Sequence, residues 1–268
     1  ADDINAFFKD PAIHAILSST GGYNANSLLR LLDYESIEKN PKIFCGYSDI
    51  TALNVAITAK AHLVTFNGPT VLPSFGEYGG PLPFTVEQFK HVLCDALPAG
   101  LLPSPSDFSD ENLWWEKEDD RPRRMKPASP PHVIYGGRVK GVLLGGNLET
   151  LTMLGGTDYM PDFKGSILFL EEMGGSTDSI ERNLTYLEQL GIFDKIAGLI
   201  YGRSYQLEDD EVRPLDTILS EFATRYGLPT VANIDCGHTG PMLTMPLGVS
   251  AELDADNGKV IITDSAVR

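Results

Sequence analysis

The first third of the chain alternates short apolar runs with stretches in which apolar residues recur at helical spacing. The runs at 13–18, 42–45 and 63–66 are typical of buried strands, and the stretches at 25–32 and 50–60 are typical of helices. Strands that alternate with helices predict a parallel sheet covered on both faces. Functional groups of such a sheet gather at the carboxyl ends of its strands.

A second alternating region begins near residue 137 and predicts another α/β unit. Strands are expected at 138–144, 166–170, 197–201 and 230–234, and helices at 148–154, 179–190 and 214–226. The chain should then end in a hairpin of 248–253 and 259–263, because Asn257-Gly258 is a strong turn signal. A hairpin next to parallel strands predicts a mixed sheet.

Residues 98–131 interrupt this alternation. Prolines recur there, charges crowd together, and Trp114-Trp115 stand among polar neighbours. Long connections in compact proteins are usually functional or disordered, and the tryptophans argue against disorder because disordered segments are poor in aromatics. We therefore expect a first domain at 1–97, a connecting segment at 98–136 and a second domain at 137–268.

Composition excludes several classes of function. The 268 residues carry a net charge of −16, which argues against a general nucleic-acid binder because phosphate contacts need a basic face. No apolar run reaches the roughly 18 residues of a membrane span, and the acidic start Ala1-Asp2-Asp3 does not resemble a signal peptide. Cys45, Cys94 and Cys236 lack the spacing of a disulfide framework or a zinc site. No G-x-G-x-x-G follows a strand, so a flavin or NAD enzyme is not expected.

A candidate nucleophile lies in Gly46-Tyr47-Ser48-Asp49, between an expected strand and an expected helix. A serine at such a turn is held at the edge of the sheet beside the free N–H groups that open the helix, and those groups can receive an oxyanion. The hydrolase pattern G-x-S-x-G is not met, because Ile50 stands in place of the second glycine. Ser48 and Asp49 are also favoured helix caps, so a purely structural role remains the alternative.

A serine nucleophile needs a base, and the base needs a partner that orients it. Among the five histidines, only His238 lies just past the carboxyl end of an expected strand in a loop flanked by glycine. Glu171 ends the apolar strand at 166–170, where a charge has no packing reason to be, although a solvated residue at the start of a loop is the alternative. The order serine, acid, histidine also occurs in α/β-hydrolases.

Five motifs together resemble the LD-carboxypeptidase family of serine peptidases, peptidase family S66. They are SSTGGYNANSLL, GYSDIT, VKGVLLGGNLETL, SILFLEE and CGHTGPMLTMPLGV, and the similarity extends from about Asp2 to the C-terminus. The long insert with Trp114-Trp115 resembles the microcin C immunity branch, the MccF-like peptidases. The resemblance implies an α/β fold with an N-terminal Rossmann-like parallel-sheet domain and a smaller C-terminal α/β domain with a mixed sheet. It also implies a cytoplasmic homodimer without metal or other cofactor, and no nucleic-acid or membrane partner.

The resemblance also implies roles for particular residues. Ser48 would be the nucleophile, His238 the general base and Glu171 its partner. The backbone N–H groups of Gly22 and Asp49 would form the oxyanion hole. Substrate contacts are expected from Gly21, Asn147, Trp114 and Trp115. Asn147 is equally a good helix cap, and the tryptophans could instead be buried at a domain interface.

Two substrates fit this resemblance. An MccF-like enzyme cleaves the amide that joins an acyl-aspartate to a nucleotide analogue, and a murein LD-carboxypeptidase removes a terminal D-alanine from a tetrapeptide. The tryptophan pair favours the first substrate. A non-catalytic binder of muropeptides or nucleotides is the alternative from another class. Family members carry about one more strand–helix unit before the point where this chain starts, so we expect the first domain to lack that unit.

Overall fold

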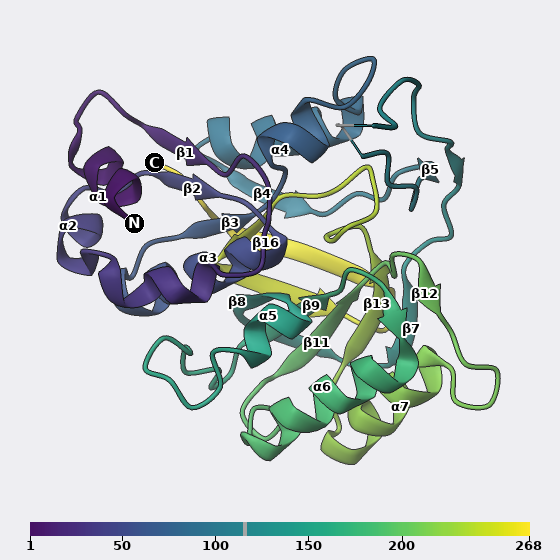
Figure 1. Cartoon of the computed structure of the whole chain (residues 1–268). Helices are drawn as coiled ribbons and strands as arrows, with labels where there is room; N and C mark the ends of the chain where they lie inside the picture. Colours follow the sequence, from purple (N-terminus) through teal and green to yellow (C-terminus); the bar gives the residue numbers. More distant parts are fainter. Residues whose placement is uncertain (115–116) are drawn as a thin grey trace.

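The computed structural model describes residues 1–114 and 117–268 and contains two main sheets. The first has the strand order β1-β2-β3-β14 and the second the order β4-β16-β15-β8-β9-β11-β13-β7. In Figure 1 the first sheet lies with the N-terminal helices at the upper left, and the strands of the second run toward the lower right. The mixed α/β architecture expected from the sequence is confirmed.

The first sheet is formed by short strands that the N-terminal helices surround. β1 (Ala15–Leu17), β2 (Ile43–Cys45) and β3 (Thr65–Asn67) are parallel, and β14 (Met245–Leu247) returns from the C-terminal half to pair antiparallel with β3. Their helices are α1 (Asp2–Lys9), η1 (Ala25–Leu31), α2 (Tyr34–Lys39), η2 (Ser48–Ile50), α3 (Thr51–Ala61), η3 (Val71–Phe75) and α4 (Pro83–Cys94). Most residues of α3 are buried, because this helix lies between the two halves of the molecule.

The second sheet has a parallel centre and antiparallel margins. β8 (Arg138–Asn147), β9 (Ile167–Glu171), β11 (Gly198–Gly202) and β13 (Thr230–Ile234) are parallel neighbours. The predicted terminal hairpin is present as β15 (Ser250–Asp254) and β16 (Lys259–Ser265). The helices of this half are α5 (Leu148–Thr152), α6 (Thr177–Gln189) and α7 (Leu215–Tyr226), and α6 and α7 lie together at the bottom of Figure 1. Ile180, Leu184 and Leu187 form the buried stripe of α6.

The secondary structure departs from the sequence-based expectation in several places. Residues 25–31 form a 3₁₀ helix, and the short helix α2 was not expected. The segment expected to be a connection contains β4 (Pro98–Leu101), β5 (Asp107–Phe108), β6 (Lys126–Pro127) and β7 (His132–Tyr135). β4 and β7 are the two edges of the second sheet, so each has a partner on one side only, and prolines are tolerated at such edges.

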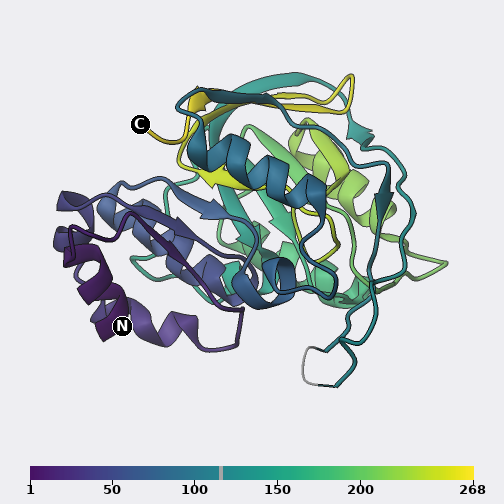
Figure 2. The ribbon, with the colours of Figure 1, turned by 90° about the horizontal axis from the view of Figure 1, so that it is seen from above.

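One buried apolar core extends through both halves. Leu53 and Ala56 of α3 belong to it together with Leu144 and Leu148, which flank the end of β8. Both termini lie on the side of the N-terminal half in the two views, and residues 102–114 and 117–131 run along the opposite side (Figure 2). In the part of the chain that the structure describes, no helix is both long and apolar enough to cross a membrane.

Candidate active site

Ser48 lies in a strained turn between β2 and α3. Its φ of 63° is in the left-handed region that residues other than glycine seldom adopt. Gly46 must be small, because a Cβ there would lie 2.3 Å from the Ser18 Oγ. Asn54 of α3 donates to the carbonyl oxygen of Gly46 over 2.8 Å and fixes the turn from behind. A strained serine between a strand and a helix is the geometry of a nucleophile elbow.

The loop that carries Gly21 and Gly22 lies directly against this turn. A Cβ on Gly21 would stand 3.1 Å from the Ser48 Oγ, so a side chain there would crowd the candidate nucleophile. The Asp49 carboxylate accepts hydrogen bonds from the backbone N–H groups of Asn24 and Ala25, each over 3.0 Å. The Asp49 side chain thus caps η1, the helix that follows the glycines, and does not cap its own helix.

His238 and Glu171 are in direct contact. The His238 Nδ1 lies 2.6 Å from the Glu171 Oε2, and the Glu171 side chain is fully buried at the end of β9. The imidazole packs against Tyr47 with ring centroids 4.9 Å apart, and the centroid of the Tyr205 ring lies 6.1 Å from that of the imidazole. Ser48 and His238 line the same pocket, but no hydrogen bond joins their side chains. Catalytic hydrogen bonds often tighten only when substrate is bound.

Several contacts fix the loop that carries His238. Gly237 must be a glycine, because a Cβ there would lie 2.6 Å from the Glu171 Oε2. Asn67 at the end of β3 donates to the carbonyl oxygen of Cys236 over 3.0 Å. Asp235 forms a buried ion pair with Arg203, whose Nε lies 2.6 Å from its Oδ1. The loop is therefore held from the first sheet and from the second.

Asn147 fulfils the capping role that the sequence left open. Its Oδ1 accepts from the Thr150 N–H over 3.0 Å at the start of α5, and its own N–H donates to the Thr51 Oγ1 over 3.0 Å. The residue also lines the pocket, one strand away from Glu171 in the register of β8 and β9. The end of β8 is thereby locked to the helix that follows Ser48.

The pocket around Ser48 has a volume of about 390 Å³. Trp114 lines it and is 50 % exposed, so burial at a domain interface does not describe this side chain. Trp115 lies outside the described residues. The other four histidines do not line the pocket, and the structure brings Gly21, Gly22, Ser48, Asp49, Trp114, Asn147 and His238 to its wall.

Sequence reasoning missed several charged groups of the site. The guanidinium of Arg123 pairs with both carboxylate oxygens of Glu77 over 2.6 and 2.7 Å on the pocket wall. Glu172 is buried beside the Glu171–His238 pair, where burial and then the charge of Glu171 raise its pKa to about 7. Buried groups whose pKa is shifted in this way are typical of functional sites. The adjacent glutamates at the end of an apolar strand were the available signal for Glu172, whereas nothing in the charged segment distinguished Arg123.

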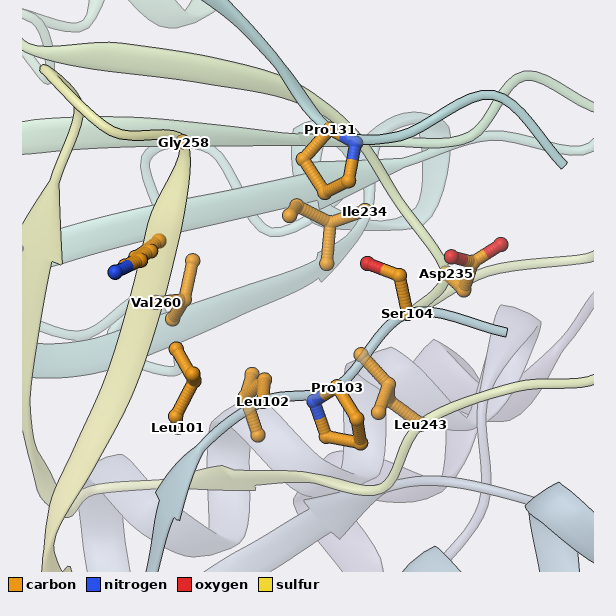
Figure 3. Close-up of a pocket in the computed structure, with 11 residues that line it drawn as sticks. Leu101, Leu102, Pro103, Ser104, Pro131, Ile234, Asp235, Leu243, Gly258 and Val260 are labelled. Carbon is orange, nitrogen blue, oxygen red and sulfur yellow. The ribbon is translucent and has the colours of Figure 1, made fainter. Parts of the chain in front are cut away.

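A second cavity of about 230 Å³ is separate from this site and has no lining residue in common with it. Figure 3 shows Leu102, Pro103, Ile234 and Val260 around this space, with the Asp235 carboxylate at its margin. That carboxylate is already paired with Arg203. The cavity marks where the start of the connecting segment packs over β13 and β16.

Comparison with known proteins identifies the relatives of the chain. Residues 1–68 match the model of the LD-carboxypeptidase N-terminal domain, and residues 140–253 match that of the C-terminal domain. The chain is 39% identical over 271 residues to the microcin C7 self-immunity protein MccF of Escherichia coli, and the aligned region covers 98% of this chain and 78% of that protein. It is 38% identical over 257 residues to the putative carboxypeptidase YocD of Bacillus subtilis, covering 96% and 77%.

Solved structures agree with these sequence matches. The chain superimposes on wild-type MccF in its apo state with a TM-score of 0.92 at 36% identity, covering 100% of this chain and 81% of that one. The structure of MccF in complex with glutamyl sulfamoyl guanosine gives a TM-score of 0.91 at 36% identity, with the same coverage. Domain models, relatives and structures lead to one conclusion: the chain belongs to the LD-carboxypeptidase family of serine peptidases.

Proposed function

We propose that this protein hydrolyses an amide bond by acyl transfer to Ser48, with His238 as general base and Glu171 as the partner that orients the imidazole. The observation that carries the proposal is the 2.6 Å contact between the His238 Nδ1 and the Glu171 Oε2, next to the pocket that contains Ser48. A proton on Nδ1 that is donated to Glu171 leaves Nε2 free to accept one, as a general base requires.

The proposed reaction begins at Ser48. The Ser48 hydroxyl transfers its proton to the His238 Nε2 while its oxygen attacks the scissile carbonyl. The N–H groups of Gly22 and Asp49 receive the negative charge on the carbonyl oxygen, and loss of one such donor typically costs about 10²- to 10³-fold in kcat. His238 returns the proton to the leaving nitrogen, and an acyl-enzyme remains. Water, deprotonated by His238, releases the acid and restores Ser48.

The substrate we propose is an aminoacyl-nucleotide analogue of the microcin C type, whose cleavage detoxifies the compound. Structures of MccF in complex with glutamyl sulfamoyl guanosine and with aspartyl sulfamoyl adenosine support this class. Trp114, half exposed on the pocket wall, offers an aromatic face for the nucleoside base. Relatives named as murein carboxypeptidases are more distant, at 27% and 26% identity.

One assay with two substrates tests the proposal. The purified protein is incubated with an aminoacyl sulfamoyl adenosine and with a murein tetrapeptide, and the released products are separated and quantified. We expect turnover of the first, and loss of at least about 10³-fold in kcat for Ser48→Ala. Turnover of the tetrapeptide alone would replace the nucleotide by a murein substrate. Tight binding without hydrolysis of either compound would make the protein a binder.

The homodimer, the cytoplasmic location and the domain boundaries stay predictions. Sedimentation of the purified protein tests the first directly, and a single monomeric species over a wide concentration range would contradict it.

A further inference from the structure

The residues that line the pocket around Ser48 come from different elements. Trp114, Asp119 and Arg123 belong to the connecting segment. Glu149 of α5, Met153 just after this helix and Met173 just after β9 are a second group of lining residues, here called the acyl end. Since Trp114 is the face proposed for the base, the acyl group of the substrate is assigned to this second group. This assignment rests on the proposed function.

The charges in the pocket are almost all negative. Its one lining guanidinium among the described residues is that of Arg123, which both oxygens of Glu77 already hold. The carboxylates of Asp49 and Glu111 are also engaged, by backbone N–H groups and by Arg121 respectively. A substrate carboxylate that entered this pocket would therefore meet no free cation among the described lining residues.

Glu149 places a negative charge at the acyl end itself. It is exposed in the first turn of α5 and lines the pocket, and among the described residues no side-chain hydrogen bond or ion pair engages its carboxylate. A second carboxylate, on the acyl group of the substrate, would be repelled by this charge. MccF, whose structures include complexes with an aspartyl and a glutamyl compound, binds acyl groups of the kind that this end disfavours.

The same end offers an apolar surface. Met153, just after α5, and Met173, just after β9, line the pocket and are 47 % and 51 % exposed. Unbranched thioether side chains adapt their shape to apolar groups of different outline. Two such side chains in a pocket form a surface that an apolar group can cover, with a gain from the area removed from water.

We propose that the acyl group accepted by this enzyme carries an uncharged, apolar side chain, which lies against Met153 and Met173 while Glu149 excludes acidic ones. The α-amino group of an aminoacyl compound carries a positive charge, which the carboxylate of Glu149 attracts at this end. The substrate class is thus a neutral aminoacyl nucleotide analogue, and the acyl end of the pocket determines the specificity.

The test compares leucyl, methionyl, aspartyl, glutamyl and lysyl sulfamoyl adenosines as substrates of the wild-type protein. We expect kcat/KM for the leucyl and methionyl compounds to exceed that for the aspartyl and glutamyl compounds by about tenfold or more. Preference for an acidic compound overturns the inference but leaves the proposed function intact. Preference for the lysyl compound overturns the apolar assignment. Hydrolysis of none of the five refutes the proposed function itself.

Two variants separate the contribution of Glu149 to specificity from that of the two methionines. Glu149→Gln should raise the ratio of aspartyl to leucyl kcat/KM by about three- to tenfold, because the repulsion is gone while the shape is kept. The double variant Met153→Ala with Met173→Ala should raise KM for the leucyl compound by a similar factor. The matched control is Met125→Ala, since Met125 is also exposed, at 42 %, but lies outside the pocket.

Two results would contradict the role of the methionines. One is an unchanged ratio of leucyl to aspartyl turnover in the double variant, with thermal unfolding like that of the wild type. The other is a double variant that differs from the wild type only in its sedimentation, which would make these side chains part of a contact between two copies of the chain.

Discussion

At the scale of single residues, the site combines strain with burial. Ser48 keeps a φ of 63°, and Gly21 and Gly237 leave room where a side chain would press on the Ser48 hydroxyl and on the Glu171 carboxylate. Strained backbone persists at functional sites when the surroundings hold it in place. Here Asn54 does so from inside the fold.

The titration of Glu172 should change the free energy of unfolding with pH. Its pKa, raised to about 7 by burial and by Glu171, exceeds that of an exposed glutamate. The folded state therefore favours the neutral carboxyl. Its contribution to the free energy of unfolding is complete below the pKa of an exposed glutamate and is lost as the pH rises through 7. Urea unfolding should show that the wild type loses on the order of 2 kcal/mol more than Glu172→Gln between pH 5 and pH 8.

The groups that face Glu172 include Glu171, His238 and the backbone N–H groups of Gly174 and Tyr205, which donate to its carboxylate. Parallel stability curves for the wild type and Glu172→Gln would show that Glu172 is ionised in the folded protein at both pH values.

At the scale of elements, the candidate oxyanion hole depends on a link between η1 and η2. The Asp49 carboxylate holds the N–H groups of Asn24 and Ala25, and so fixes the loop of Gly22 next to the N–H of Asp49 itself. Asp49→Ala should lower kcat by about 10²-fold with a smaller change in KM, because the two donors lose their mutual position.

Asp33→Ala is the matched control for that variant. Asp33 caps α2 by accepting from the Ser36 N–H, and it lies outside the pocket. The variant should lower the free energy of unfolding slightly, through loss of the cap, and leave kcat unchanged. Equal losses of kcat in the two variants would mean that general destabilisation, and not the position of the donors, limits the rate.

The sequence predicted the elements that an apolar pattern defines and missed those that tertiary pairing creates. The buried strand that ends at Glu171 and the helix over 179–190 follow from apolar spacing alone. β14 has three residues and a proline, and only its pairing with β3 makes it a strand. His238 and Glu171 could be chosen because each follows a strand, but the partner of Arg123 depends on long-range packing that no local pattern encodes.

At the scale of the whole molecule, the Glu77–Arg123 ion pair joins the connecting segment to the N-terminal half. The two side chains are only 9 % and 14 % exposed, and Arg123 also lies against Gly240 in the loop of His238. Arg123→Met should destabilise the protein by about 3 kcal/mol, because the carboxylate of Glu77 is left buried and unpaired. The substrate KM should rise as the wall that carries Trp114 loses its anchor.

The comparison for Arg123→Met is Lys39→Met, which breaks the exposed pair with Glu35. The two side chains are 68 % and 76 % exposed, so solvent screens the pair and its loss should change the stability little. Similar unfolding midpoints for the two variants in a urea titration would contradict the anchoring role of Arg123.

The return of β14 to the first sheet has a consequence for truncated forms of this protein. A fragment that ends before residue 245 leaves the edge of β3 with unpaired backbone groups, and such an edge is a template for pairing between molecules. Expressed alone, the nucleophile-bearing half should therefore precipitate. Supplying residues 245–247 as part of a complementing fragment should keep it in solution.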